Sequence, residues 1–386
     1  MSYPVIVSAV RTAIAKKGGA LKDFHPYQYG GMVIEEVLKR GKVNKEDINE
    51  VIFGNCLSNA GNIARVSSLH AGLDPSVPGL TIDRQCGSGI NAVALGAQAV
   101  LHEDQIVVVG GTESMTHTPH LLESTGRVYN QAPPKFLTRI LTPPEYGDAP
   151  MGITAENVAE KYSISREEQD TYAYQSQMRM KTAMEEGRFD EQILPIEVRG
   201  PKGQTFEFKT DEHPRPSITL DDLKKLKPVF KQGGTVTAGT SSGINDGAAA
   251  LLMMSEKEAE KRNLQPMGKV ITSAVVGVDP DIMGIGPVPA IEKVLKKTNL
   301  TLDDIDLVEI NEAFASQVIA SQKELNIDPD KLNVTGGAIA HGHPIAATGA
   351  ILVTKVLYEL KNRQLNRALI SACIGGGQGI ALIVER

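Results

Sequence analysis

The chain has 386 residues, of which 41% are hydrophobic and 22% are charged, as in a soluble globular protein with two or three domains. Its net charge of -6 argues against nucleic acid as the main partner, and no apolar run or signal-peptide layout points to a membrane or to export. The three cysteines, Cys56, Cys86 and Cys373, form no C-x-x-C pair, which argues against a disulfide framework or a zinc site and favours a reducing cytoplasm.

Strand and helix patterns alternate along the N-terminal part of the chain. Buried-strand patterns cover residues 4–9, 50–54 and 105–111, and a helix pattern covers residues 27–41. A second helix pattern follows Cys86. This β-α-β alternation predicts a mostly parallel sheet with helices on both faces.

The stretch Leu80-Thr-Ile-Asp-Arg-Gln-Cys86-Gly-Ser-Gly predicts a reactive thiol. A short β-branched run ends at Cys86, and an apolar helix face follows at Ile90, Val93, Ala94, Ala97 and Leu101. A thiol at a helix N-terminus ionises more easily, because unpaired N–H groups and the helix dipole stabilise an anion. The alternative is a small buried hydrophobic residue, the ordinary role of a lone cysteine inside the cell.

The middle of the chain, from about residue 119 to 240, loses the alternation of buried strands. It contains Pro133-Pro134, Pro143-Pro144 and a polar helical segment over residues 165–186. We expect an insertion that packs over the sheet layers and shapes a ligand site. The apolar run 247–254 then predicts a buried strand that completes the first half of the chain.

An internal repeat relates the two ends of the chain. Residues 33–53 align without a gap with residues 290–310, with identities at Ile34, Glu35, Val37, Leu38, Lys39, Asp47, Ile48 and Val51. The strand pattern starting at Lys269 also resembles the one starting at Val5. We infer two halves of one design, related by duplication.

The repeat aligns the turn at Cys86 with a glycine-rich turn that carries His341 and His343 near the start of another helix pattern. If the halves pack about a pseudo-two-fold axis, a histidine lies beside the cysteine thiol, as an activated nucleophile requires. The alternatives are a surface or capping histidine and a metal ligand. A metal site is disfavoured because no third ligand is nearby in sequence.

Two further motifs carry possible site residues. Asn311-Glu-Ala-Phe314 ends the strand pattern 307–310, where Asn311 either closes a turn or holds a water or carbonyl oxygen. Cys373-Ile-Gly-Gly-Gly-Gln-Gly379 lies between two apolar strands. Its glycines form either an oxyanion hole of backbone N–H groups or a plain hairpin turn.

Together, Cys86-Gly-Ser-Gly, Asn311-Glu-Ala-Phe, Gly342-His-Pro and Cys373-Ile-Gly-Gly-Gly-Gln-Gly resemble the thiolase family in their order and separation, over nearly the whole chain. The resemblance implies an α/β fold of two βαβαβ halves in five layers (α-β-α-β-α) with an inserted loop domain. We expect an N-terminal half from residues 1–118 plus 241–265, the insertion at 119–240, and a C-terminal half at 266–386.

The resemblance implies an acyltransferase that condenses two acetyl-CoA molecules to acetoacetyl-CoA and CoA, or cleaves 3-ketoacyl-CoA by thiolysis. Cys86 would carry the acyl group, His343 would take its proton, and Cys373 would be the second acid/base. Asn311, through a water, and His343 would line one oxyanion hole. The backbone N–H groups of Cys86 and Gly375 would form the other.

The resemblance also implies binding residues and partners. The coenzyme A contacts would be Met151, Arg215, Ala238, Gly239, Ser242, Ala313 and Phe314. Coenzyme A thioesters would be substrates, with no metal and no resident cofactor. A cytoplasmic homo-oligomer is implied, either a dimer or a dimer of dimers (a homotetramer), with part of the insertion at the contact.

Five positions depart from the commoner family pattern: Pro150, Thr240, Ser241, His341 and Ala346. They touch the acyl and pantetheine region, so chain-length preference stays open between a short-chain synthetic enzyme and a degradative 3-ketoacyl-CoA thiolase. Cys373 argues against a decarboxylating condensing enzyme. It also has no role in a cysteine hydrolase, and the full set of catalytic residue types argues against an inactive acyl-CoA-binding relative.

Overall fold

The computed structural model describes residues 3–124, 133–200 and 203–386. Residues 1–2 of the predicted first half, and residues 125–132 and 201–202 of the predicted insertion, lie outside the described residues. None of the helices in the described part combines the length and the hydropathy needed to span a lipid bilayer.

The secondary structure follows the predicted order of elements. The strands are β1 (Pro4–Thr12), β2 (Ala15–Lys16), β3 (Glu50–Gly54), β4 (Gly79–Ile82), β5 (Val107–Ser114), β6 (Leu121–Leu122), β7 (Phe136–Leu137), β8 (Ile193–Leu194), β9 (Ile196–Arg199), β10 (Thr205–Phe208), β11 (Asn245–Ser255), β12 (Gly268–Gly277), β13 (Leu307–Ile310), β14 (Arg367–Ile374) and β15 (Gln378–Glu385). The helices are α1 (Pro26–Gly41), α2 (Ile63–His70), α3 (Ser88–Glu103), α4 (Met151–Lys161), α5 (Arg166–Glu185), α6 (Leu220–Lys224), α7 (Glu256–Lys261), α8 (Pro287–Thr298), α9 (Ala315–Leu325), α10 (Ala338–His341) and α11 (Ile345–Arg363). Each strand and helix predicted from the sequence patterns is present, within a few residues of its predicted ends.

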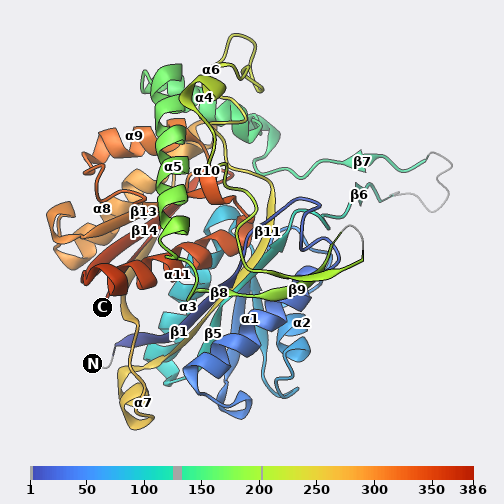
Figure 1. Cartoon of the computed structure of the whole chain (residues 1–386), viewed down its shortest axis with the longest axis vertical. Helices are drawn as coiled ribbons and strands as arrows, with labels where there is room; N and C mark the ends of the chain where they lie inside the picture. The colour runs from blue at the N-terminus through green and yellow to red at the C-terminus, as the bar shows by residue number, and fades with distance from the viewer. Residues whose placement is uncertain (1–2, 125–132, 201–202) are drawn as a thin grey trace.

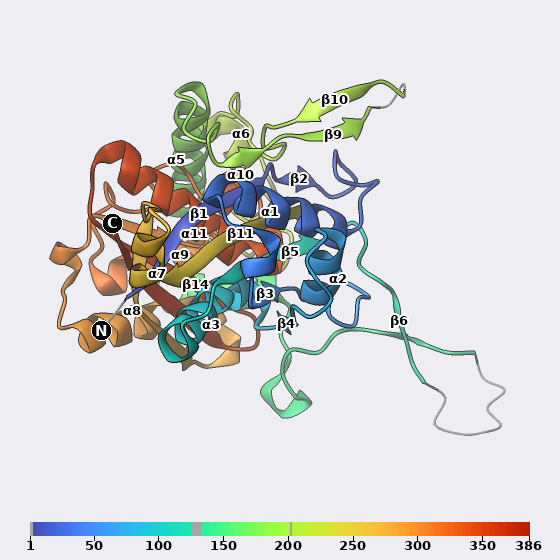
Figure 2. The same cartoon turned by 90° about the horizontal axis from the view of Figure 1, so that it is seen from below.

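The elements stack in five layers, as predicted. Helices α1 and α2 cover the outer face of the N-terminal strands, and α8 and α9 cover the C-terminal strands (Figure 1). Helices α3 and α11 lie between the two sets of strands and share one apolar core with both. Figure 2 shows the same layers from below. Cys86 and His343 are separated by the same number of residues as the first residues of β3 and β13. They therefore occupy equivalent positions in the duplicated halves.

The prediction of a mostly parallel sheet was wrong. β3 pairs in parallel with β4 and β5, and β13 pairs in parallel with β14. The long central strands are antiparallel: β11 lies between β1 and β5, and β15 lies between β12 and β14. The sequence pattern misled because a strand buried on both faces is a continuous apolar run in either orientation.

Strand β11 shows how one strand serves two cores. Ala248, Ala250, Leu252 and Met254 pack under α1, whereas Ala249, Leu251 and Met253 face the middle layer. This alternation follows from the two-residue side-chain period of a strand. Strand β1 pairs with both β11 and β12, so it links the strands of the two halves at the centre of the molecule.

Glycines let the two middle helices approach closely at their N-termini. A Cβ atom on Gly89 of α3 would collide with the backbone nitrogen of Ala350, and one on Gly349 of α11 would collide with that of Ile90. Backbone therefore packs directly on backbone at this crossing. The contact fixes the spacing of the two helix starts, and hence of the turns that precede them.

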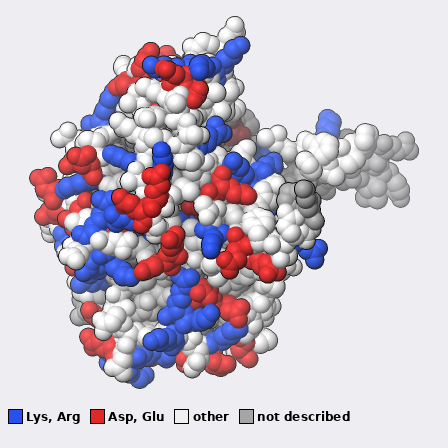
Figure 3. All heavy atoms as spheres, viewed as in Figure 1, with Lys and Arg blue, Asp and Glu red and all other residues white. Residues whose placement is uncertain are grey.

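The insertion packs on both halves and also extends away from the body. Strand β8 pairs with β1, and Ile196, Val198 and Phe208 join the core under α1. Helix α5, whose cap residue Ser165 accepts from Glu168 N–H, packs against α9 and α10. Strands β6 and β7 form an arm that projects from the molecule, visible in all three whole-molecule views (Figure 3). On the face shown in Figure 3, Lys and Arg side chains alternate with Asp and Glu.

Replacing Gly89 by alanine should destabilise the fold by about 1–3 kcal/mol, because the new methyl group has to displace the α11 backbone. The better helix propensity of alanine, worth about 1 kcal/mol, offsets only part of this cost. Urea denaturation followed by circular dichroism measures the change. Gly61→Ala is the control, since its Cβ would have no neighbour within 4 Å. Equal midpoints for the two variants would contradict this account of the helix crossing.

Candidate active site

Cys86 lies on a short turn between a strand and a helix. β4 ends at Ile82, and α3 begins at Ser88, so the thiol precedes the helix by two residues. Gln85 has a φ of 44°, in the left-handed region that non-glycine residues rarely adopt. Its N–H donates to Asp83 Oδ1 at 2.9 Å, and the Ser88 hydroxyl donates to its carbonyl at 2.7 Å. These bonds hold the turn that presents the thiol.

His343 lies on the equivalent turn of the second half. Gly342, with a φ of 100°, connects α10 to the residues before α11, and any Cβ there would collide with the Asn245 side chain. The His343 N–H donates to Asn245 Oδ1 at 3.0 Å. Beside it, His341 is buried and its Nδ1–H donates to the Gly342 carbonyl at 2.8 Å. The backbone of His343 is therefore held by side chains on both sides.

The two turns meet as the duplication predicts. His343 Nε2 lies 3.2 Å from Cys86 Sγ and 3.5 Å from Asn311 Nδ2. On the other side of the ring, Nδ1 lies 2.6 Å from the Thr348 hydroxyl. For Nε2 to accept the Cys86 proton, Nδ1 must carry the ring proton and donate it to Thr348. Asn311 Oδ1 is buried without a partner in the structure, so the amide has a free acceptor in this site.

Cys373 is buried at the end of β14, and Gly375, Gly376 and Gly377 form the turn into β15. The glycine run is therefore a hairpin turn. It also lies at the reactive thiol, because the backbone N–H of Gly375 and that of Cys86 itself both interact with the Cys86 sulfur. The same glycines can therefore form a hairpin turn and also supply an N–H group to an oxyanion hole.

Burial controls the ionisation of all three groups. It raises the pKa of the Cys86 thiol to about 11, against the opposing effect of the two backbone N–H groups. It lowers the pKa of His343 to about 4. The pKa of Cys373 is raised by burial and then by the nearby charge of Cys86. Burial thus favours the neutral thiol and the neutral imidazole over a thiolate–imidazolium pair.

The residues predicted to contact coenzyme A fall into an inner and an outer group. Met151, Ala313 and Phe314 pack in one apolar cluster with Cys373. Ser242 N–H donates to the Ala313 carbonyl at 3.0 Å, which joins the Ser242 segment to this cluster. Ala238 and Arg215 are exposed, and Gly239 lies beside Leu223 and Leu226. The structure brings the inner residues to the thiols and leaves Arg215 on the outer surface.

Sequence reasoning missed three side chains in this region: Thr348, Asn245 and Phe230. Phe230 is 40% exposed, packs edge-on against Phe314 at 6.1 Å between centroids and lies against Gly152. Phe230 could have been considered from the sequence, because it is an aromatic residue shortly before the predicted contacts Ala238 and Gly239. Thr348 and Asn245 had no such signal, since a single Thr in a helix or Asn at a strand start has many ordinary roles.

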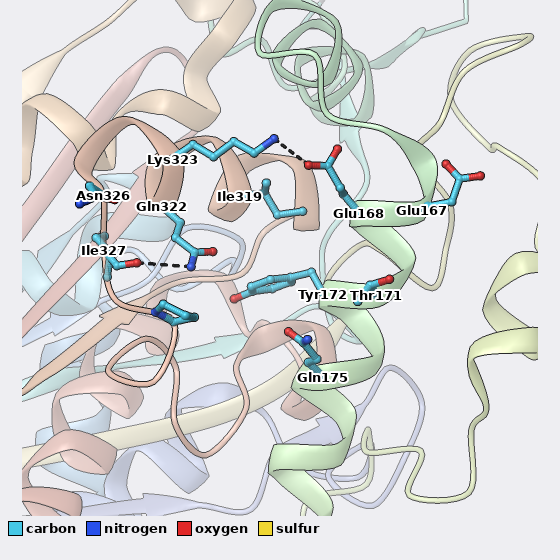
Figure 4. A pocket seen from close by; sticks show the side chains of 11 residues that line it. Glu167, Glu168, Thr171, Tyr172, Gln175, Ile319, Gln322, Lys323, Asn326 and Ile327 are labelled. Carbon is cyan, nitrogen blue, oxygen red and sulfur yellow. Dashed lines mark hydrogen bonds and ion pairs between the residues drawn. The ribbon is translucent and has the colours of Figure 1, made fainter.

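A separate groove of about 580 Å³ lies between α5 and α9 on the outside of the molecule (Figure 4). Tyr172, Ile319 and Lys323 line it, with an ion pair from Lys323 to Glu168 at 2.7 Å. It contains none of the predicted site residues. Within the described ranges, no cluster of three or more His, Cys, Asp or Glu side chains has the arrangement of a metal site.

Profiles of two protein-domain families match the chain. The one described as "Thiolase, N-terminal domain" covers residues 4–257, and "Thiolase, C-terminal domain" covers residues 264–386. The mitochondrial 3-ketoacyl-CoA thiolase of Bos taurus is 44% identical over 98% of this chain and 97% of its own length. The acetyl-CoA acetyltransferase of Cupriavidus necator is 44% identical over the full length of both.

Solved structures give the same result. The crystal structure of human mitochondrial 3-ketoacyl-CoA thiolase has a TM-score of 0.94 and 42% identity, covering 100% of this chain and 99% of the other. The crystal structure of that human enzyme in complex with CoA has a TM-score of 0.93 and 43% identity, covering 100% and 98%.

Replacing Thr348 by valine should slow the alkylation of Cys86 by iodoacetamide about tenfold, equivalent to about 1.4 kcal/mol, because His343 Nδ1 loses the partner that orients its ring. Peptide mass spectrometry after timed quenching measures the rate. Thr354→Val is the matched control, since the Thr354 hydroxyl on the same helix bonds only to the Ala350 carbonyl. A Thr348→Val rate equal to that of the control would show that the hydroxyl does not orient the ring.

Proposed function

The chain belongs to the thiolase family, and we propose that Cys86, His343 and Cys373 divide the steps of its reaction between them. It is an acyltransferase that carries out thioester condensation and the reverse cleavage of 3-ketoacyl-CoA. The observation that carries the assignment is the contact of His343 Nε2 with Cys86 Sγ at 3.2 Å, with Cys373 buried beside them.

The first half-reaction transfers an acetyl group to Cys86. Its sulfur attacks the thioester carbonyl carbon while its proton moves to His343 Nε2. The carbonyl oxygen becomes an oxyanion, which the N–H groups of Cys86 and Gly375 stabilise. The bond from carbon to the coenzyme A sulfur then breaks. Cys373 gives its proton to the leaving thiolate and is left as a thiolate itself.

The second half-reaction forms the carbon–carbon bond. The Cys373 thiolate takes an α-proton from a second acetyl-CoA, and the enolate oxygen is stabilised by protonated His343 and by a water held on Asn311. The carbanion attacks the acetyl carbon on Cys86 and forms acetoacetyl-CoA. The Cys86 thiolate leaves and recovers its proton from His343, so every proton is returned. These side chains supply all the acid, base and nucleophile chemistry, so we propose that no resident cofactor or metal takes part.

We further propose that coenzyme A lies against the insertion. The inner cluster of Met151, Ala313 and Phe314 suits the pantetheine arm, and the exposed guanidinium of Arg215 suits the phosphates of the nucleotide. The exposed ring of Phe230 packs against Phe314 and adds apolar surface to the inner cluster. The human relative solved with CoA supports the ligand class. We propose domain bounds of 119–240 for the insertion, which supplies Met151, Arg215 and Phe230, with halves at 1–118 plus 241–265 and at 266–386. Ala313 and Phe314 come from the C-terminal half.

We propose a cytoplasmic dimer or dimer of dimers. Strand β4 lies at one end of the strand order and exposes Leu80, and the adjacent α2 exposes Val66 and Leu69. Such an open edge is a template for strand pairing with a second copy. The arm carries further exposed apolar side chains, Leu122, Phe136, Leu137 and Ile140, which suit a second contact. The free thiols of all three cysteines suit a reducing compartment.

Cys86→Ala should abolish acyl-enzyme formation, whereas Cys373→Ala should still acetylate Cys86 and fail to condense. Intact mass spectrometry after mixing with acetyl-CoA, beside an assay of acetoacetyl-CoA formation, separates the two steps. Thr354→Val is the control, because the Thr354 hydroxyl donates to the Ala350 carbonyl within α11 and has no part in the proposed steps. A Cys373→Ala protein without an acetyl group on Cys86 would show that the roles are divided differently.

Thiolysis should be fastest for acetoacetyl-CoA and slow about tenfold or more for 3-ketoacyl chains of eight carbons and above. The reason is that Leu141 and Met151 close over Gly375, within 3.0 and 3.4 Å of the place of a Cβ there. A panel of chain lengths, run beside acetyl-CoA condensation, measures the preference. Leu141→Ala should relax it toward longer chains. Equal rates across the panel would instead favour the degradative, longer-chain alternative.

A further inference from the structure

Glu113 is a buried carboxylate that the proposed reaction does not use. It lies near the end of β5, is fully buried, and accepts four N–H groups. The Asn55 side chain and the Leu57 backbone donate to Oε1 at 3.0 and 3.1 Å. The backbone N–H groups of Cys56 and Ala346 donate to Oε2 at 3.0 and 3.3 Å. One carboxylate therefore binds the loop after β3 in the first half and the start of α11 in the second.

The loop on the first side supports the turn that carries Cys86. Cys56 Sγ lies 3.2 Å from Asp83 Oδ1 and 3.6 Å from the Ser88 hydroxyl. These are the groups that hold the turn, since Asp83 accepts from Gln85 and Ser88 donates to Gln85. A shift of the Cys56 segment is therefore transmitted to the position of Cys86.

The contact on the second side lies three residues after His343. Ala346 is in the first turn of α11, where backbone N–H groups have no partner within the helix. Its carbonyl lies against Gly54 and Gly111, which have no side chain that could hold it at a distance. Glu113 thus bonds to α11 at the point where the helix packs onto the first half, next to the turn of His343.

The charge of Glu113 has no cationic partner. In the described residues, no Lys, Arg or His side chain is in hydrogen-bond contact with it, and its charged neighbour is Asp83. Burial raises its pKa to about 7, against the opposing effect of the three backbone N–H groups. The negative charge also raises the pKa of Cys86, so it opposes formation of the reactive thiolate. The presence of this buried carboxylate is therefore not explained by a favourable electrostatic effect on the Cys86 thiol.

We propose that Glu113 is a positioning residue that holds Cys86 and His343 in contact by binding the backbones behind both. The inference rests on the proposed roles of these two residues. It assigns to Glu113 a geometric function, carried by its two oxygens and their four N–H donors, and no contact with the substrate.

The test compares Glu113→Gln and Glu113→Asp with the unchanged protein. Glutamine keeps the shape but turns one oxygen into an N–H donor that faces N–H groups, and aspartate keeps the charge but is one methylene too short to reach both backbones. Both variants should alkylate Cys86 with iodoacetamide at pH 8 about 10–100 times more slowly. In acetyl-CoA condensation, kcat should fall by a similar factor, with KM within about twofold.

The direction of the effect is diagnostic. Removal of a nearby negative charge alone would lower the pKa of Cys86 and speed alkylation, so slower alkylation of Glu113→Gln reports lost geometry. A rate equal to or above that of the unchanged protein overturns the proposal. If neither variant folds, as judged by circular dichroism, Glu113 is a folding residue and the positioning role is rejected.

Glu359→Gln is the matched control, a buried carboxylate at the far end of the same helix, about 20 Å along α11 from its start. It pairs with Arg363 and Arg188 and should leave the alkylation rate unchanged. This experiment is independent of the proposed division of chemistry. If acetyl-CoA fails to acetylate Cys86, the proposed function is wrong, while the alkylation rates still decide whether Glu113 positions the pair.

Discussion

The structure depends on one contact, the crossing of α3 and α11 at their N-termini. Gly89 and Gly349 allow backbone to pack on backbone there, and the turns before the two helices consequently meet. Each helix start carries unpaired N–H groups and the positive end of a helix dipole. Two such ends facing each other favour negative charge between them. The N–H of Ala346, in the first turn of α11, accordingly donates to the buried carboxylate of Glu113.

The duplication explains why the site needs both halves. Equivalent turns of the two halves carry Cys86 and His343, which are the nucleophile and the base in the proposed mechanism. The corresponding strands β5 and β14 of the two halves also carry different residues near their ends. β14 ends in Cys373 and a glycine turn, whereas β5 ends in Glu113 and leads into the insertion. The first copy thus has a buried carboxylate, Glu113, near the end of this strand, and the second has a buried thiol, Cys373.

Burial sets the chemical character of the site. It raises the pKa of the Cys86 and Cys373 thiols and lowers the pKa of His343, so it disfavours the charged form of each group. The N–H groups of Cys86 and Gly375 are then available where negative charge develops on oxygen, which is the arrangement that stabilises a transition state. Leu141 and Met151, both from the insertion, lie close to Gly375, where we propose that they restrict the acyl chain.

Much of this could be predicted from the sequence alone. The motifs and the gap-free repeat led to Cys86, His343, Asn311 and Cys373, because glycine turns, cysteine and histidine placement and helix periodicity are local properties of the chain. The five layers were implied by the resemblance to the thiolase family. The orientation of the central strands was predicted wrongly, since an apolar run such as that of β11 has the same pattern in parallel and antiparallel sheets. Thr348, Asn245 and Glu113 could not be predicted. Each is a common residue whose role comes only from the distant backbone or ring that folding brings to its oxygen, and that proximity is a property of the tertiary structure.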